Sequence, residues 1–102
     1  MKKVQFMIKV KLHTILGIKE IIGKREIEVD VSENSSLSDL MTTIVGKWGR
    51  ELSDYLYEQE SDKIKNYIRF MVNGQDISFL DGMDTKLKDG DEVMIFPPVS
   101  GG

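Results

Sequence analysis

The chain has 102 residues, of which 40% are hydrophobic and 30% charged, and this composition suits one small globular domain. It contains no cysteine, so it has no disulfide, thiolate metal ligand or nucleophilic sulfur of its own. The formal net charge of −3 argues against nucleic acid as a partner, and no apolar run approaches the roughly 20 residues of a membrane span. A strand-like pattern, and no signal-peptide block, follows Met1, so we expect a cytoplasmic protein.

Residues 4–12 and 26–31 alternate between apolar and polar side chains, the pattern of strands with one buried face. Their apolar residues can be matched in an antiparallel hairpin, with Val10 opposite Ile27, Ile8 opposite Val29 and Phe6 opposite Val31. This register places Lys11 opposite Glu26 and Lys9 opposite Glu28. Such cross-strand pairs give the lysines a structural role, which we favour over nucleic-acid binding.

The connection between these strands, residues 13–24, is too apolar for a solvated loop. We expect it to fold against the edge of the core with one helical turn, while Gly17 and Gly23 supply the bends. His13 is the only histidine in the chain. Without a second histidine or a cysteine, we expect neither a metal site nor a catalytic dyad there.

A helix is predicted from Ser36, because Ser36 and Asp39 have the spacing of a capping box. The apolar residues that follow recur at helical spacing and form one stripe: Leu37, Leu40, Met41, Ile44, Val45 and Trp48. This stripe should cover one face of the sheet. We interpret Trp48 as a residue at the edge of the core, in preference to a binding residue.

The second half of the chain predicts two long strands, 68–72 and 92–96, and a short one, 75–77. Asn73-Gly74 is a strong signal for a tight hairpin turn. Residues 49–66 suggest a short second helix around Leu52 and Leu56, followed by a solvated loop. The aspartates at 81, 84, 89 and 91 lack the spacing of a calcium loop and are interpreted as turn formers.

This order of elements predicts an α+β fold, the β-grasp or ubiquitin-like fold, with one main helix packed on one face of a mixed sheet. We expect a domain over residues 1–96, with 49–66 as a variable insertion. The helix leaves the other face of the sheet in water. Alternation places Met7, Met71, Met94 and Phe96 on that face, and we interpret them as a docking patch for a partner protein.

Six residues follow the last predicted strand, and we expect them to form an extended tail: Pro97, Pro98, Val99, Ser100, Gly101 and Gly102. Proline holds φ near −65° and lacks an N–H, so the strand must stop there and the tail should project. The glycines add almost no bulk, so the carboxylate of Gly102 can enter a narrow active site of another protein. A carboxylate must be activated before it reacts, and the chain has no G-x-x-x-x-G-K-[ST] phosphate loop. We therefore expect that it binds no cofactor itself and that a partner uses ATP to adenylate Gly102, which could then accept sulfur or a lysine amine.

The run Phe96-Pro97-Pro98-Val99-Ser100-Gly101-Gly102 resembles the MoaD family of ubiquitin-like sulfur carriers, the small subunits of molybdopterin synthase, which are related to ThiS. The resemblance extends to 21–24, the amphipathic helix, 72–74 and 89–93, but 49–66 is longer than expected for compact members. It implies that a ubiquitin-activating-type adenylyltransferase adenylates Gly102 and that a sulfur donor protein supplies a thiocarboxylate. The tail would then enter the large subunit of molybdopterin synthase, with Phe96 at the interface, and deliver sulfur for the molybdenum or tungsten cofactor.

In this interpretation the chain is a carrier and not an enzyme. The resemblance also leaves other uses open, because related carriers feed thiamine or cysteine synthesis and some prokaryotic ones are conjugated to lysines. A plain interaction domain is the third alternative. The sequence does not decide between these pathways or define the role of 49–66.

Overall fold

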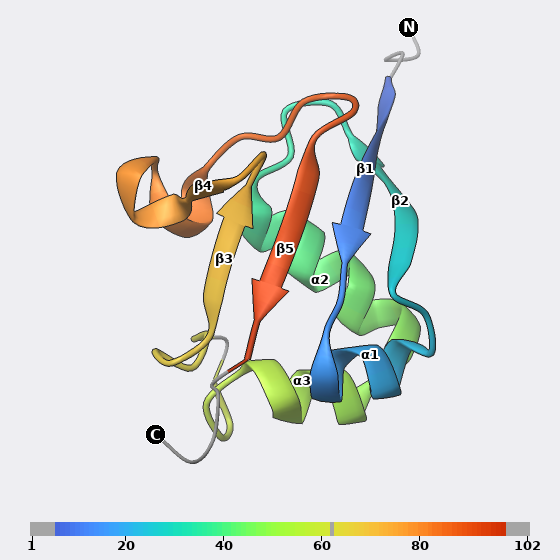
Figure 1. Cartoon of the computed structure of the whole chain (residues 1–102), viewed down its shortest axis with the longest axis vertical. Helices are drawn as coiled ribbons and strands as arrows, with labels where there is room; N and C mark the ends of the chain where they lie inside the picture. Colours follow the sequence, from blue (N-terminus) through green and yellow to red (C-terminus); the bar gives the residue numbers. More distant parts are fainter. Residues whose placement is uncertain (1–5, 62, 98–102) are drawn as a thin grey trace, which may run out of the picture.

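The computed structural model describes residues 6–61 and 63–97. In this part of the chain a single sheet stands in front of a layer of helices (Figure 1). The strands are β1 (Met7–His13), β2 (Glu26–Ser32), β3 (Arg69–Val72), β4 (Gln75–Asp76) and β5 (Glu92–Phe96). The helices are α1 (Leu16–Ile22), α2 (Leu37–Trp48) and α3 (Arg50–Leu56), with short 3₁₀ helices η1 (Ile77–Phe79) and η2 (Gly82–Asp84).

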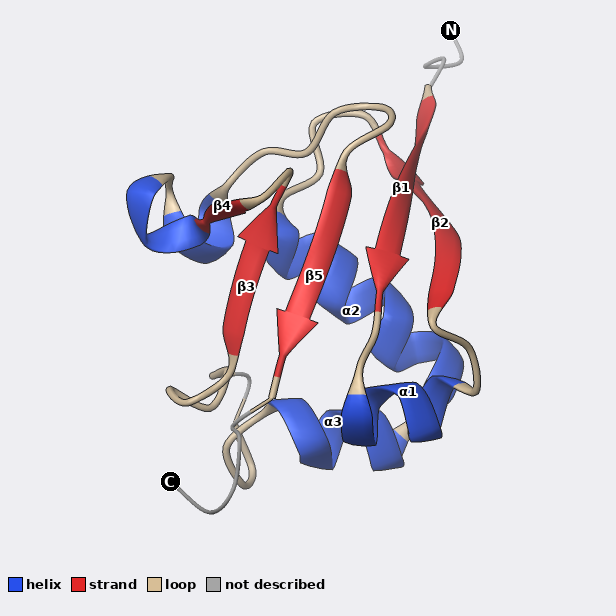
Figure 2. Ribbon diagram, viewed as in Figure 1, coloured by secondary structure: helices blue, strands red, loops and turns tan. Residues whose placement is uncertain are grey.

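The sheet has the strand order β2-β1-β5-β3-β4. β5 lies at its centre, parallel to β1 and antiparallel to β3, while the two hairpins β1-β2 and β3-β4 are antiparallel. Figure 2 shows α2 crossing behind the sheet, with α1 and α3 near the end of the sheet where β5 finishes. This mixed sheet with a main helix on one face confirms the predicted β-grasp fold.

The local signals of α2 are confirmed in detail. The Ser36 hydroxyl accepts a hydrogen bond from Asp39 N at 3.2 Å, and Ser36 N donates to the Asp39 carboxylate at 2.9 Å. These bonds hold the pKa of Asp39 below its usual range, the backbone N–H of Ser36 being the main cause. Four residues of the apolar stripe are buried: Leu37, Leu40, Met41 and Ile44. The other two, Val45 and Trp48, are partly buried and pack against the core.

The predicted register of the first hairpin was wrong by two residues. Val10 lies opposite Val29, and Leu12 lies opposite Ile27. A slip of two residues leaves every side chain on its original face, so alternation alone could not detect it. The hairpin closes where Thr14 N donates to Arg25 O at 2.8 Å, a contact that depends on the connection and not on the strands.

Two further details of this hairpin differ from expectation. Lys9 lies opposite Asp30 and pairs with it at 3.7 Å, while Lys11 lies opposite Glu28 but reaches Glu26 diagonally at 3.8 Å. Phe6 was expected in the buried row, yet it is 63% exposed. It lies one residue before β1, outside the strand whose inward side chains are buried.

The connection between β1 and β2 contains the seven-residue helix α1. This helix is longer than the one helical turn that was expected. Gly23 ends this helix with φ 88°, as expected for a left-handed cap. Gly17 was also expected to supply a bend, but it lies inside α1, and the positive φ, 53°, belongs to Leu16. Gly17 has another role: a Cβ there would lie 2.6 Å from the Tyr55 ring, so glycine allows α1 and α3 to approach.

The segment 49–66 supplies part of the core. As predicted, it begins with a short helix, α3, in which Leu52 and Leu56 are fully buried. A solvated loop follows, and it closes with an isolated bridge between Tyr57 and Ile64. Along the described residues, no helix is long and apolar enough to cross a membrane.

The turns around β4 and β5 follow the predicted chemistry. Asn73 and Gly74 have φ values of 51° and 82°, which is the conformation that a tight hairpin turn requires. Asp89 accepts a hydrogen bond from Lys9 N, and Asp91 accepts one from Lys88 N, each at 2.8 Å. These two aspartates therefore stabilise the turn into β5.

Candidate functional site

The end of β5 is the place where the chain leaves the sheet. Phe96 is the last residue of this central strand, and Pro97 follows it. Pro97 was expected to be the first residue of a projecting tail, but it is buried. The remaining tail predictions, on Pro98, Val99, Ser100, Gly101 and Gly102, lie outside the described residues.

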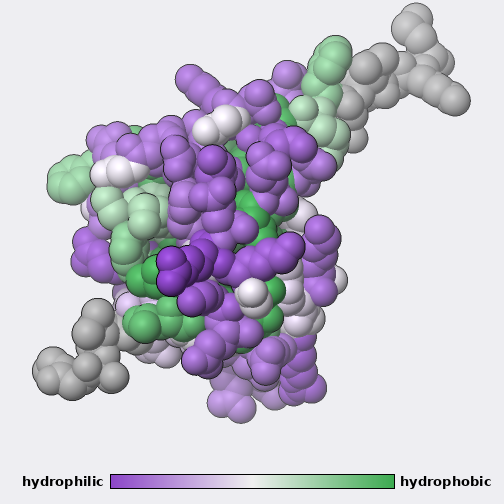
Figure 3. Space-filling model, turned by 45° about the vertical axis from the view of Figure 1, so that its right-hand side comes forward, coloured by the Kyte–Doolittle hydropathy of each residue, from purple (hydrophilic) through white to green (hydrophobic). Residues whose placement is uncertain are grey.

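A hollow of about 450 Å³ lies beside this exit point. Its lining is mostly apolar and comes from three parts of the chain: Ile15, Tyr67, Arg69, Met71, Asp76, Phe96 and Pro97. Ile15 is 36% exposed and Tyr67 50% exposed, so their apolar surface remains open to a partner. Figure 3 shows apolar surface, in green, gathered at the lower left of this view among polar side chains.

An ion pair between Arg69 and Asp76 borders the hollow. Arg69 donates to the Asp76 carboxylate at 2.5 Å, and Ser78 N donates to the other carboxylate oxygen at 2.9 Å. These hydrogen bonds, chiefly the one from Ser78 N, lower the pKa of Asp76 to about 2. Asp76 is therefore ionised at neutral pH and holds the Arg69 guanidinium at the border of the hollow.

The structure brings together three of the four residues predicted for the docking patch. Met71 lies opposite Met94 on the neighbouring strand, and Phe96 is two residues further along β5, on the same face. All three are half-buried. Met7 is on this face too, but it lies six residues before His13, the partner of Met94 in β1, which is about 20 Å along the strand. Met7 therefore does not belong to the cluster at the end of β5.

Sequence reasoning missed the other residues of the hollow. Arg69 could have been found, because it alternates with Met71 on the open face of β3. Ile15 and Tyr67 gave no such signal, since both lie in connections whose paths depend on the packing of α1 and α3.

The ThiS family model matches residues 17–102, which is most of the chain. The chain belongs to the ThiS family. The resemblance seen in the tail is therefore confirmed at the level of the family, and this ThiS-family chain is a ubiquitin-like sulfur carrier domain.

Two relatives illustrate the range of the family. The ThiS-family chain is 29% identical over 96 residues to small archaeal modifier protein 3 of Haloferax volcanii, covering 90% of this chain and 97% of that protein. It is 34% identical over 67 residues to the sulfur carrier protein CysO of Mycobacterium tuberculosis, covering 65% of this chain and 67% of CysO. Both are named as carriers or modifiers and not as enzymes.

Solved structures agree with the fold. Small archaeal modifier protein 1 of Methanosarcina acetivorans superposes with a TM-score of 0.81 and 29% identity, covering 95% of this chain and 99% of that one. A putative molybdopterin converting factor, subunit 1, of Pyrococcus furiosus gives a TM-score of 0.70 and 28% identity, covering 90% and 99%. The ThiS-family fold thus serves proteins whose names point to different pathways.

His13 lies on the open face of this ThiS-family sheet. Its Nε2 is 2.7 Å from a Glu92 carboxylate oxygen, and its Nδ1 is 3.5 Å from Glu26. The histidine therefore links three neighbouring strands. In the part of the chain that the structure describes, no three histidine, aspartate or glutamate side chains are grouped to hold a metal ion.

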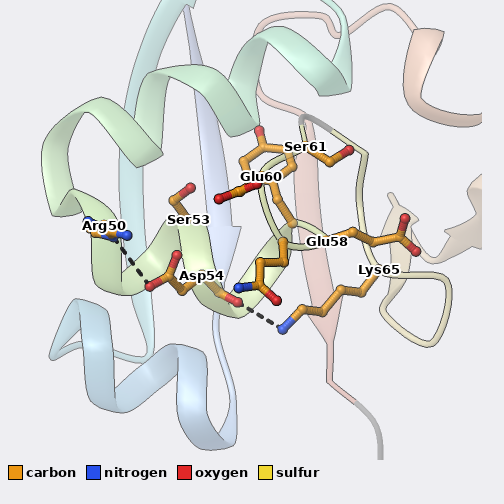
Figure 4. Close-up of a pocket in the computed structure, with 9 residues that line it drawn as sticks. Arg50, Ser53, Asp54, Glu58, Glu60, Ser61 and Lys65 are labelled. Atoms are coloured by element: carbon orange, nitrogen blue, oxygen red, sulfur yellow. Dashed lines mark hydrogen bonds and ion pairs between the residues drawn. The ribbon is translucent and has the colours of Figure 1, made fainter.

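A second hollow, of about 610 Å³, lies between α3 and the loop that follows it (Figure 4). Its labelled lining is polar: Arg50, Ser53, Asp54, Glu58, Glu60, Ser61 and Lys65. Lys65 Nζ donates to Asp54 O at 2.8 Å, and Arg50 pairs with the Asp54 carboxylate at 3.8 Å. The Lys65 contact ties the end of the loop to α3, whereas the Arg50–Asp54 pair lies within α3. The segment 49–66 therefore has a structural role at this point.

Proposed function

We propose that Gly102 is the reactive residue of this sulfur carrier and that the chain is the small subunit of a molybdopterin synthase. A ubiquitin-activating-type adenylyltransferase adenylates the Gly102 carboxylate, and a sulfur donor protein converts it to a thiocarboxylate. The large synthase subunit then receives the tail, Pro98 to Gly102, and the sulfur passes to the precursor of the molybdenum or tungsten cofactor.

The chemistry requires two steps at one carboxyl group, the first at its oxygen and the second at its carbon. First, a Gly102 carboxylate oxygen attacks the α-phosphorus of ATP, and pyrophosphate leaves. A hydrosulfide equivalent from the donor then attacks the carbonyl carbon, and AMP leaves with that oxygen. The product is a thiocarboxylate, and no net oxidation or reduction takes place. ATP is a substrate of the partner and not a cofactor of this chain.

The observation that carries the proposal is the position of the apolar hollow at the end of β5. Met71 and Phe96 line it, and the Arg69–Asp76 pair borders it. A partner that must hold a short tail in its active site needs a surface of the carrier close to the base of that tail. The hollow provides such a surface, because Pro97, the residue before the tail segment 98–102, is part of its lining. The named subunit from Pyrococcus furiosus supports the synthase as the destination.

A protein modifier is the second candidate. The similarity to small archaeal modifier protein 3 extends over 90% of this chain and favours conjugation of the same activated glycine to lysine amines. Adenylation is common to both uses, so they differ only in the nucleophile that attacks the carbonyl. A carrier for cysteine or thiamine synthesis would share the thiocarboxylate and differ in its acceptor.

Intact-mass spectrometry separates these candidates. The chain is incubated with its cognate adenylyltransferase, ATP and a sulfide source, with and without the large synthase subunit and its substrate. Replacement of one oxygen by sulfur at the C-terminus, followed by its loss when the large subunit is present, supports the proposal. Adducts on lysines of other proteins favour the modifier. A variant without Gly102 should remain folded and unmodified, and sulfur transfer by that variant would refute the assignment of Gly102.

A further inference from the structure

β2 has one free edge. Among the described elements it pairs only with β1, and it lies at the outer side of the sheet in Figure 1. A free edge presents unpaired N–H and C=O groups to which another extended chain can bind. This edge is separated from β5 by β1, so a partner bound there leaves the end of β5 accessible.

The hydrogen bonds of the hairpin identify the free groups. Thr14 N donates to Arg25 O at one end, and Glu33 N donates to Phe6 O at the other, each at 2.8 Å. In an antiparallel pair, successive residues bond alternately inward and outward. Ile27, Val29 and Val31 therefore bond to β1, and the backbone groups of Glu26, Glu28 and Asp30 face outward.

The charges of this edge disfavour a second copy of the chain as its occupant. Every residue of β2 from Glu26 to Asp30 on the open face is acidic. If two copies paired antiparallel through β2, carboxylates would lie opposite carboxylates in every close register, which is destabilising. Asp30 pairs with Lys9 and Glu26 with Lys11, whereas Glu28 has no ion pair within the described residues. The edge thus suits a strand with basic side chains on that face.

On the helix side of the sheet, a hollow of about 470 Å³ lies directly beside the same edge. Ile22, Ile27 and Trp48 form its apolar part, and Lys24 and Lys47 also line it. Trp48 is half-buried at the end of α2, with Lys47 Nζ 5.8 Å from the centre of its ring. In an added strand, the residue opposite Ile27 would point to this side of the sheet and into the hollow.

We propose that β2 is a docking edge for an extended segment of a partner protein. The segment pairs with β2 as an additional strand, places an apolar side chain over Ile27 and Trp48, and carries lysine or arginine opposite Glu28 and Asp30. Backbone hydrogen bonds give affinity in this mode of recognition, and the alternating side chains give specificity.

Nuclear magnetic resonance with three synthetic peptides tests the proposal on the full chain. The first peptide alternates lysine and valine. The second has glutamate in place of lysine, and the third keeps the lysines but has proline in place of valine, so it cannot form a strand. The first peptide should shift the amide signals of residues 26–32 and the Trp48 indole signal, and it should slow hydrogen exchange of the Glu28 and Asp30 amides at least tenfold. The other two should leave these signals unchanged.

Two variants of Glu28 test the edge itself, and both remove the Glu28 carboxylate. Glu28→Pro removes an outward N–H that β1 does not use, a position where an edge strand tolerates proline. It should weaken binding of the first peptide at least tenfold, as should Glu28→Lys, which keeps the N–H and reverses the charge. Glu51→Lys makes the same charge change on exposed α3 and should leave the affinity within twofold. If Glu28→Pro does not fold, Glu28→Lys and its control carry the test.

Several results would overturn the proposal. Equal binding of the proline peptide would show that charge alone attracts the ligand. Chemical-shift changes confined to Met71 and Met94 would place the ligand on the open face of the sheet. Equal losses of peptide affinity in Glu28→Lys and Glu51→Lys would show that the β2 edge has no specific role. Concentration-dependent shifts of residues 26–32 in the free chain would show that β2 pairs with a second copy.

Discussion

Phe96 and Arg69 lie directly opposite each other on β5 and β3, at the end of the sheet where the chain leaves it. Both side chains line the hollow, so one cross-strand pair gives it an aromatic surface and a cation. Asp76 holds this cation in place. The centre of the candidate docking site is therefore built on paired strands, and the connections add Ile15 and Tyr67 to its lining.

Replacing Phe96 by alanine should impair activation of the carrier. Truncation removes aromatic surface next to the tail, and such central contacts commonly cost tenfold or more in binding. We expect kcat/KM for adenylation by the cognate adenylyltransferase to fall about tenfold. Phe6→Ala is the matched control, because Phe6 is 63% exposed and does not line the hollow. If both variants are folded and have equal kcat/KM, the hollow is not part of the docking surface.

Gly17→Ala should destabilise the fold by about 1–2 kcal/mol, because the new Cβ would displace the Tyr55 ring. Gly46→Ala is the control: Gly46 lies in α2 with nothing within 4 Å of its added Cβ, so alanine should stabilise by about 1 kcal/mol. Chemical denaturation measures both changes. Burial raises the pKa of Tyr55, so an ultraviolet pH titration of Gly17→Ala should show that pKa lowered toward its ordinary value. An unchanged pKa would contradict displacement of the ring.

The Asp76 carboxylate should make stability depend on acid pH. Its pKa is about 2 in the fold and near 3.8 in the unfolded chain, so the unfolded state binds more protons between these values. The stabilisation is complete above about pH 4 and is lost as the pH falls through about 2. Asp76→Asn should therefore be less stable than the wild type at neutral pH, and the difference should shrink in that acid window. A difference independent of pH would contradict this assignment.

Ser36→Ala should cost about 1 kcal/mol of folding stability, because it removes the acceptor for Asp39 N at the start of α2. Ser38→Ala tests a serine two positions later that is exposed and makes no side-chain cap. It should change stability by less than about 0.5 kcal/mol. Urea unfolding of the two variants side by side checks the difference, and similar losses would mean that the cap contributes little.

Features that depend on neighbours in the chain were predictable. The capping box of Ser36, the Asn73-Gly74 turn and the alternation of the strands each require only residues a few positions apart. The β-grasp followed from their order. The tail of the family was also recognisable, since its chemistry resides in a short run ending at Gly102.

Within the strands and α2, the sequence by itself determined which residues face the core, because burial there follows the local periods of helix and strand. Only the tertiary structure decided the hairpin register, the separation of Met7 from Met94, and the meeting of Ile15 and Tyr67 with Phe96. A slip of two residues preserves every face, and the path of a connection depends on what packs against it. Contacts between distant segments therefore become defined when α1 and α3 pack together and β5 pairs between β1 and β3.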